Sequence, residues 1–269
     1  MFPLCFVHMK FPFKLRSVPA FLASLSVIVL LAGCKTGGAP ARDVAHYPAD
    51  AATGLPGKGP LQTWPGFTNV WADRHAAWQR DTNNENGAVV FLGDSITQGW
   101  NSLARVFPDL KVVNRGIGGD TTRGVLYRLN ADVIALKPVA VVLLIGINDI
   151  GLGAKPEDIA DNVKAIILDL KRFNPHMPVI VCKVMPSSTE QHRPADKIEQ
   201  LNALVDEIVK SNPQCIRCDT WSIYAGENGE CKKDEFPDLL HPNAIGYTKW
   251  ANALKPIFAQ LNLGAEKTP

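Results

Sequence analysis

The sequence has almost no excess of charge of either sign. Its 28 lysines and arginines nearly balance its 26 aspartates and glutamates, and the formal net charge is +2. The first 33 residues contain three of the basic residues and no acid, so the rest of the chain is slightly acidic. A nucleic-acid-binding domain needs a basic face that neutralises phosphates. The composition therefore gives no support to nucleic acid as a partner.

No apolar run reaches the length of a membrane span, which is about 20 residues. The run at 18–32 follows three basic residues and ends in Leu31-Ala32-Gly33-Cys34, which resembles a bacterial lipobox. A basic region, a short apolar core and small residues before the cleavage site are typical of an export signal. We therefore predict a lipoprotein signal peptide at 1–33 and a lipid on Cys34. An ordinary secretory signal and an uncleaved anchor are the alternatives.

This signal predicts a location in the bacterial cell envelope, on the periplasmic face or at the outer membrane, with the lipid as the only membrane contact. Residues 34–66 are rich in Gly, Pro and Ala and cannot bury enough apolar surface to fold alone. They are predicted to form a flexible tether. A single domain is predicted at 67–263, beginning with an amphipathic helix at 67–81, and a C-terminal tail at 264–269.

Cysteine is scarce, and no cysteines and histidines have the spacing of a zinc site. Of the six cysteines, four follow residue 34. Cys182 lies in an apolar run and is predicted to be buried. Cys215 and Cys218 form a CxxC motif, but no second ligand pair accompanies them and the tract is predicted to be a strand, so we predict no metal site. Export would permit a disulfide between Cys231 and either Cys215 or Cys218.

From residue 88 onward, apolar runs alternate with helical patterns. Short apolar runs are typical of strands buried on both faces of a parallel sheet, and the amphipathic stretches between them are typical of crossover helices. The predicted strands lie at 88–92, 112–114, 139–145, 179–184 and 216–219, and the predicted helices at 122–136, 156–172, 194–210 and 243–261. Right-handed crossovers then give a three-layer α/β/α fold with a five-stranded parallel sheet.

Glycine and polar residues follow several of the predicted strands. They form Gly93-Asp94-Ser95, a glycine-rich turn at Gly116–Gly119, and Gly146-Ile147-Asn148-Asp149, while Asp238-Leu239-Leu240-His241 precedes the last helix. Because the carboxyl ends of parallel strands meet at one edge of the sheet, we expect these groups to lie close together. Taken singly, Asp94 and Ser95 could simply cap a helix, and His241 could lie at a helix start.

Together, these residue types suit acyl transfer. A serine hydroxyl is a weak nucleophile that needs a base within hydrogen-bond reach and a carboxylate that orients the base. His241 can act as the base for Ser95, and Asp238 can orient its ring. An oxyanion also needs prepositioned donors. The backbone N–H groups of Ser95 and Gly119 and the side-chain amide of Asn148 are the candidates.

Two other glycine motifs are incomplete. The turn at 116–119 could cradle a phosphate at a helix N-terminus, but Gly-x-Gly-x-x-Gly is not completed. Thr97 stands where the second glycine of a Gly-x-Ser-x-Gly elbow would be, which disfavours an α/β-hydrolase. The other candidate polar and aromatic residues are predicted as follows: Asp94, Asp120 and Asp149 shape loops, His46, His75, His176 and His192 face solvent, and Trp100 and Trp221 either line the cleft or pack.

Four blocks, in this order and spacing, resemble the SGNH or GDSL hydrolase family over nearly the whole folded domain. They are Gly93-Asp94-Ser95, Gly119 within its turn, Gly146-Ile147-Asn148-Asp149, and Asp238-Leu239-Leu240-His241-Pro242. The resemblance implies a flavodoxin-like fold with strand order 2-1-3-4-5 and no cofactor or metal. It implies Ser95 as nucleophile, His241 as base and Asp238 as orienting acid, with Ser95, Gly119 and Asn148 as the oxyanion hole.

The longer motif segments look most like the branch of this family that contains platelet-activating-factor acetylhydrolase subunits and bacterial sugar O-acetylesterases. We therefore predict a serine ester hydrolase that removes short acyl groups, most of all acetyl, from carbohydrate or similar small-molecule esters. A lysophospholipase or thioesterase for longer acyl chains is the alternative enzyme. A non-catalytic surface binding module is the alternative from another class.

Overall fold

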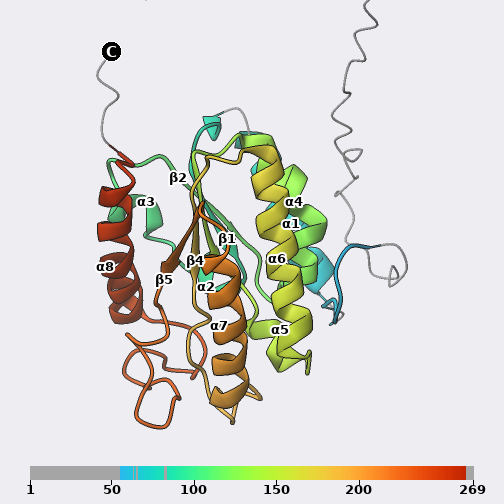
Figure 1. Cartoon of the computed structure of the whole chain (residues 1–269), viewed down its shortest axis with the longest axis vertical. Helices are drawn as coiled ribbons and strands as arrows, with labels where there is room; N and C mark the ends of the chain where they lie inside the picture. The colour runs from blue at the N-terminus through green and yellow to red at the C-terminus, as the bar shows by residue number, and fades with distance from the viewer. Residues whose placement is uncertain (1–54, 63, 65, 82–83, 265–269) are drawn as a thin grey trace, which may run out of the picture. The chain divides into compact units, whose positions relative to one another are not determined.

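Five short strands form one parallel sheet in the computed structural model (Figure 1). The strands are β1 (Val89–Gly93), β2 (Val112–Gly116), β3 (Ala140–Leu144), β4 (Val179–Cys182) and β5 (Cys215–Cys218). Their spatial order is β2-β1-β3-β4-β5, and every neighbouring pair is parallel. The central strands β1, β3 and β4 are buried along their whole length, which explains their continuous apolar sequences. The predicted α/β fold and strand order are confirmed.

The structure describes residues 55–62, 64, 66–81 and 84–264. The predicted signal peptide, Cys34, most of the predicted tether and residues 265–269 of the tail lie outside the described residues. Within the described ranges, no helix combines the length and the apolar character needed to cross a membrane.

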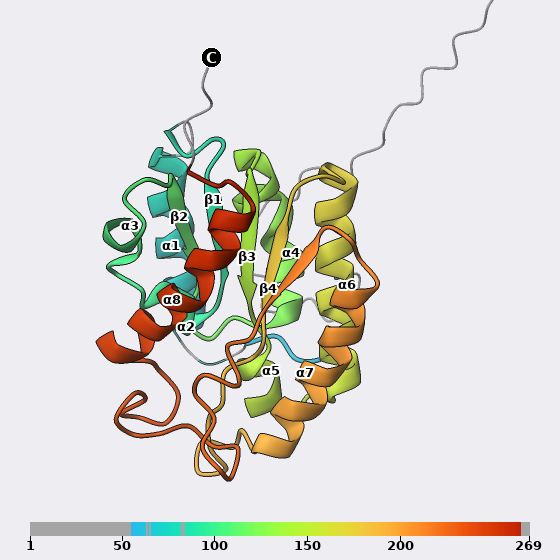
Figure 2. The ribbon, with the colours of Figure 1, turned by 60° about the vertical axis from the view of Figure 1, so that its left-hand side comes forward.

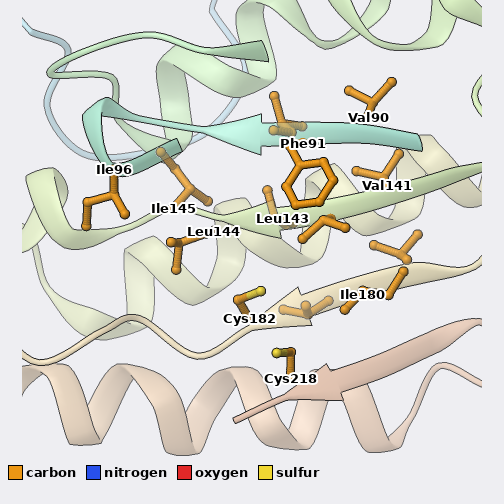
Figure 3. Packing of buried hydrophobic residues seen from close by; sticks show 14 of the residues in the cluster. Val90, Phe91, Ile96, Val141, Leu143, Leu144, Ile145, Ile180, Cys182 and Cys218 are labelled. Atoms are coloured by element: carbon orange, nitrogen blue, oxygen red, sulfur yellow. The ribbon is translucent and has the colours of Figure 1, made fainter. Parts of the chain in front are cut away.

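Helices cover both faces of the sheet (Figure 2). The helices α4 (Thr122–Asp132), α6 (Pro156–Phe173) and α7 (Ala195–Lys210) pack side by side on one face. The opposite face is covered by α8 (Ala244–Gln260) and the short helices α2 (Ser95–Gln98) and α3 (Leu103–Val106). This arrangement confirms the predicted three layers. The core between the layers includes Phe91, Leu143 and Ile180 of three adjacent strands (Figure 3).

The helix predicted at 122–136 is interrupted in the structure. It ends at Asp132, and a short 3-10 helix, η2 (Ile134–Leu136), follows. Val133 between them has φ −122° and ψ −61°, outside the α-helical region, and Lys137 after them has φ 46°. These backbone angles turn the chain toward β3.

The first helix, α1 (Phe67–Asp81), has the predicted bounds and packs on a small cluster of its own, which includes Trp71, Trp78 and Ile117. The prediction that His75 faces solvent is wrong. His75 is 4% exposed, and the centroid of its ring lies 3.7 Å from that of Trp71. Burial, together with the nearby arginines, lowers the pKa of His75 to about 3. The imidazole is therefore neutral and belongs to the packed interior of this face.

Two other histidines, His176 and His192, are exposed as predicted, and His46 lies outside the described residues.

The four cysteines of the described chain are free, so the disulfide that export would permit from Cys231 does not form. Cys218 on β5 is in register with Cys182 on β4, and both thiols face the apolar core (Figure 3). Cys231 is in another segment, where its backbone N–H donates to the carbonyl of Ser187. The register of the sheet thus directs Cys218 toward Cys182, which is buried as predicted.

The described part of the segment predicted as a tether contacts the domain. The backbone N–H of Lys58 donates to Asn162 Oδ1 at 2.9 Å, and Asn162 Nδ2 donates to the carbonyl of Lys58 at 2.8 Å. Further along, the Thr121 hydroxyl donates to the carbonyl of Pro60, and Gln62 Nε2 donates to the carbonyl of Gly119. Residues 55–62 therefore form a strap across α6 and α4, because polar side chains of these helices satisfy their backbone groups.

The strand register brings three strand ends to the same level. Gly93, the last residue of β1, is opposite Gly116 of β2 and Leu144 of β3. A Cβ atom at Gly93 would lie 2.3 Å from the carbonyl oxygen of Leu144, so only glycine fits this close approach. The loops that follow these three strands consequently start side by side at one edge of the sheet.

Candidate functional site

Ser95, His241 and Asp238 form one hydrogen-bonded chain at this edge of the sheet. His241 Nε2 lies 2.9 Å from Ser95 Oγ, and His241 Nδ1 lies 2.6 Å from Asp238 Oδ2. Ser95 opens α2 directly after β1, whereas the other two residues lie 143 or more positions later, in the loop before α8. The fold thus brings the three residues into the geometry of a nucleophile, a base and an orienting acid.

Asp238 is held in place by the backbone of its own loop. Its Oδ1 accepts the backbone N–H groups of Leu240 at 3.0 Å and His241 at 2.7 Å, which leaves Oδ2 to face the imidazole. Burial opposes ionisation of this carboxyl group, but the hydrogen bonds from His241 and Leu240 keep its pKa below the usual value. The side chain is therefore a carboxylate at neutral pH and stabilises the Nδ1–H tautomer of His241.

Asp94 caps the helix that begins with Ser95, as predicted for a loop-shaping residue. Its Oδ1 accepts the backbone N–H of Ile96 at 2.9 Å, while no hydrogen-bond partner for Oδ2 lies among the described residues. The space that Asp94 lines together with Ile147 and Met185 is too small for a water molecule. This dry environment, in which burial is the largest cause, raises the pKa of Asp94 to about 7.

The Gly118-Gly119 turn borders Ser95. A Cβ atom at Gly118 would lie 3.7 Å from Ser95 Cβ, and the backbone N–H of Gly118 donates to Gln98 Oε1 at 2.6 Å. Gly119 has φ +84°, a backbone conformation that favours glycine. No acceptor among the described residues takes the backbone N–H of either Ser95 or Gly119. Both donors are therefore available to an oxyanion at Ser95.

The third candidate donor, Asn148, lies in the short helix α5 (Ile147–Gly151) and is 6% exposed. Its Nδ2 donates one N–H to the carbonyl of Asp120 at 3.0 Å, and its Oδ1 accepts from Arg193 Nη2 at 3.2 Å. An amide nitrogen has two N–H groups, so the second remains for a substrate. The structure thus connects Asn148 to the loop of Gly119 through Asp120.

Buried ion pairs and hydrogen bonds hold these loops together. Asp149 accepts the backbone N–H of Thr122 at 3.0 Å and its hydroxyl at 2.6 Å. Asp120 accepts Arg128 Nε at 2.7 Å, and Arg128 Nη2 donates to the carbonyl of Gly93 at 3.0 Å. Burial raises the pKa of both acids, to about 6 for Asp149. Both residues shape loops, as predicted.

The whole of this site lies within residues 91–249, which match the model of a GDSL-like lipase/acylhydrolase family. The match covers more than half of the chain. The chain belongs to this family. It is a carboxylic ester hydrolase, and the predicted family and enzyme class are confirmed.

Curated relatives of this GDSL hydrolase include acetylhydrolase subunits. Platelet-activating factor acetylhydrolase IB subunit alpha1 of Homo sapiens is 29% identical over 195 residues, which cover 71% of this chain and 84% of that protein. The alpha2 subunit of Bos taurus is 30% identical over 209 residues, which cover 74% of this chain and 86% of that protein.

Solved structures have the same fold. A GDSL-like lipase from Bacteroides thetaiotaomicron is 26% identical, with a TM-score of 0.62 over 72% of this chain and 99% of that chain. The acetyl xylan esterase AlAXEase is 23% identical, with a TM-score of 0.53 over 63% of this chain and 98% of that chain. At that identity, the second comparison shows the fold alone.

Several residues around the GDSL site had no signal in the sequence. Arg193 and Gln191 follow β4 in a polar loop without a motif, yet Arg193 contacts Asn148, and Gln191 Nε2 donates to the carbonyl of Asp238 at 2.9 Å. Trp64 precedes α1, and its indole nitrogen would lie 3.3 Å from a Cβ atom at Gly119. Only the folded chain brings these segments to the strand ends.

Trp100 and Trp221, for which the sequence allows either packing or a place in the cleft, differ in burial. Trp100 is 1% exposed and packs against Trp250, with ring centroids 4.6 Å apart, so it belongs to the core. Trp221 is half-buried and lies beside the loop of Gly229. Among the described residues, no group of three or more His, Cys, Asp or Glu side chains is arranged to hold a metal ion.

Proposed function

We propose that the protein removes short acyl groups, most of all acetyl, from carbohydrate or similar esters through an acyl-enzyme. One observation carries this proposal: Ser95 Oγ lies 2.9 Å from His241 Nε2, beside two backbone N–H groups that have no acceptor in the described chain. A nucleophile with its base and unfilled donors for a developing oxyanion is what ester cleavage requires.

In the proposed reaction, Ser95 Oγ attacks the ester carbonyl carbon, and its proton moves to His241 Nε2. The carbonyl oxygen becomes negative and accepts hydrogen bonds from the backbone N–H groups of Ser95 and Gly119 and from Asn148 Nδ2. His241 then protonates the leaving alcohol, and the acyl group stays on Ser95. Water, deprotonated by His241, attacks the acyl-enzyme and releases the acid. Asp238 stabilises the imidazolium in both steps.

The choice of a short acyl group rests on the comparisons, because the packed side of the nucleophile does not select a chain length. Ile96 and Ile147, the residues next to Ser95 and Asn148, are 1% and 3% exposed. The space between them and Asp94 does not admit a water molecule, so no acyl group of any length enters there. The acetylhydrolase relatives and the acetyl xylan esterase neighbour have acetyl in their names.

The exposure of the catalytic loop supports a bulky polar alcohol. The side chains of His241 and Asp238 are 41% and 54% exposed, so the leaving-group side of the site is open to solvent. A sugar unit within a larger glycan can reach such a site without being enclosed, whereas lipid-binding pockets are mostly apolar and bury most of their ligand.

Rates on nitrophenyl esters from acetyl to palmitoyl, together with a panel of acetylated sugars, test the substrate. We expect the highest kcat/KM for acetyl and release of acetate from acetylated xylooligosaccharides. A maximum at eight carbons or more would instead favour the lysophospholipase or thioesterase. The variant Ser95→Ala is expected to abolish hydrolysis while leaving the fold intact. A purified protein without hydrolysis of any ester would favour the binding module.

We also propose that the enzyme is a cell-envelope lipoprotein, cleaved after residue 33 and lipidated on Cys34. The basic, apolar and small-residue order of the first 34 residues supports this proposal. Labelling with radioactive palmitate is expected for the full chain and not for Cys34→Ala. A soluble, unlabelled mature protein would contradict the anchor.

A further inference from the structure

Arg193 bridges three backbone and side-chain oxygens beside the oxyanion site. Its Nε donates to the carbonyl of Ile147 at 3.1 Å, its Nη1 to the carbonyl of Gln191 at 2.7 Å, and its Nη2 to Asn148 Oδ1 at 3.2 Å. The guanidinium lies so close to α5 that a Cβ atom at Gly151 would be 2.8 Å from Arg193 Cζ. This packing and the three bonds fix a long side chain in one position.

The contact decides which way the Asn148 amide faces. An arginine has only donors, so it can meet the amide oxygen and not the amide nitrogen. The carbonyl of Asp120 has only lone pairs, so it can meet the nitrogen and not the oxygen. Both neighbours therefore exclude the flipped amide. The second N–H of Asn148 is held in one direction before a substrate arrives, which is the preorganisation that an oxyanion donor needs.

Arg193 has no ion-pair partner in the described chain, and Asp94 is the acid whose charge acts on it from a longer distance. No Asp or Glu of the described chain lies within ion-pair distance of its guanidinium, although the side chain is half-buried. A cation that donates to an amide oxygen draws electron density from the amide and makes its N–H groups stronger donors, because hydrogen bonds in a chain polarise one another. The effect is largest when negative charge appears at the far end of the chain.

We propose that Arg193 is a positioning residue for ester hydrolysis, which fixes and polarises the Asn148 amide for the oxyanion. Arg193 acts through Asn148 and does not contact the substrate. This inference rests on the proposed function of Ser95 and its oxyanion donors. It assigns a role in the reaction to the loop after β4, which the sequence motifs leave without one.

A double-mutant cycle with Arg193→Met and Asn148→Ala tests the inference, with p-nitrophenyl acetate as substrate. Loss of one oxyanion donor costs about 10²–10³ in kcat, and we expect Arg193→Met to cost about 10–100-fold with KM unchanged. In the Asn148→Ala background, the same substitution is expected to lower kcat less than about threefold, because the amide that Arg193 orients is absent. Arg193→Lys keeps the positive charge but lacks the planar guanidinium with its several N–H donors, so it is expected to recover part of the kcat.

The exposed Arg172 on α6, which pairs with Asp169, provides the matched control, and Arg172→Met is expected to keep full activity. Should Arg193→Met fail to fold, Arg193→Lys goes through the same cycle. The inference alone would be overturned if Arg193→Met lowered kcat equally in the wild type and in Asn148→Ala. It would also be overturned if the wild type were active and Arg193→Met lowered its kcat less than twofold. A wild type without esterase activity would overturn both this inference and the proposed function.

Discussion

Asp238 holds His241 through both of its carboxylate oxygens. Oδ1 accepts the backbone N–H of His241 at 2.7 Å, and Oδ2 lies 2.6 Å from Nδ1 of the same residue. The acid therefore fixes both the main chain and the ring of the base within one four-residue turn. Leu239 inside this turn has φ 60°, so the chain adopts a left-handed conformation to close it.

This double contact predicts the effect of Asp238→Asn. The amide oxygen can keep the two backbone hydrogen bonds, which places the amide N–H₂ group against His241 Nδ1. That donor stabilises the tautomer with the proton on Nε2, which cannot accept the proton of Ser95. We expect a folded protein whose kcat falls by about 10⁴, the effect of this tautomer change in a serine protease. The measurement is kcat on p-nitrophenyl acetate, with thermal unfolding as the check on the fold.

Asp234→Asn in the same loop provides a control, because Asp234 is exposed and its backbone carbonyl, not its side chain, accepts from Asn243. Its kcat is expected to stay within twofold of the wild type. A loss below tenfold for Asp238→Asn would contradict the orienting role.

Gly119→Ala separates backbone strain from catalysis. Gly119 has φ +84°, and an added Cβ would lie 3.3 Å from both Phe67 and Trp64. The substitution is expected to cost about 1–2 kcal/mol of unfolding free energy, and also to lower kcat about 10²-fold because the N–H shifts away from the oxyanion. Chemical denaturation and initial rates measure the two effects.

Gly153→Ala is the matched control for this strain. Gly153 has φ +80°, but nothing lies within 4 Å of its added Cβ, and it follows α5 away from the reacting groups. It is expected to lose a similar amount of stability and to keep its kcat. If Gly119→Ala lost no more activity than Gly153→Ala, the backbone N–H of Gly119 would have no role as a donor.

The sequence alone predicts the sheet and the grouping of the candidate site residues at one edge of it, for reasons visible in particular residues. β1 and β3 are buried on both faces, so their sequences contain a continuous apolar signal that ends at a glycine or polar residue. The register of β1 with β2 and β3 then forces Ser95, the Gly119 turn and Asn148 to one edge. Local patterns and topology agree here, and such agreement makes a prediction reliable.

Contacts between distant polar residues were beyond prediction. His75 Nε2 lies 3.2 Å from Asp132 Oδ2 of α4, and the residues around His75 in the sequence do not predict this contact. No sequence motif indicates that a neutral imidazole is buried. The strap at 55–62 has a composition typical of a linker, yet one asparagine on α6 satisfies both backbone groups of Lys58. Arg193 likewise has its role only through the fold.

Asp94 predicts a pH dependence of stability. Its pKa in the folded protein is about 7, because the side chain is buried without a partner for Oδ2, whereas an unfolded Asp has a pKa near 3.9. The fold thus favours the protonated acid, and this contribution is complete below about pH 4 and is lost as the pH rises through about 7. We expect Asp94→Asn, which keeps an oxygen for the Ile96 N–H, to remove part of this loss.

The measurement is the unfolding free energy in urea at pH 5 and pH 8. Between these values, the wild type is expected to lose on the order of 2 kcal/mol more than Asp94→Asn. Asp73→Asn, on the exposed face of α1, provides the control and is expected to follow the wild type at both pH values. Parallel curves for the wild type and Asp94→Asn would show that Asp94 ionises as freely in the folded chain as in the unfolded one.

The strap can be tested by proteolysis, because Lys58 is a trypsin site whose side chain is 64% exposed while its backbone is bonded to Asn162. Asn162→Ala removes both hydrogen bonds, so cleavage after Lys58 is expected to become at least about tenfold faster.

Asn202→Ala is the matched control: Asn202 is equally buried and holds the backbone of Val184 by the same pair of bonds, at 2.8 and 3.0 Å. Both variants lose a buried asparagine, but only Asn162→Ala releases the strap. If the two variants were cleaved after Lys58 at the same rate, cleavage would follow the loss of global stability, and the contact with Asn162 would not be what holds residues 55–62 on the domain.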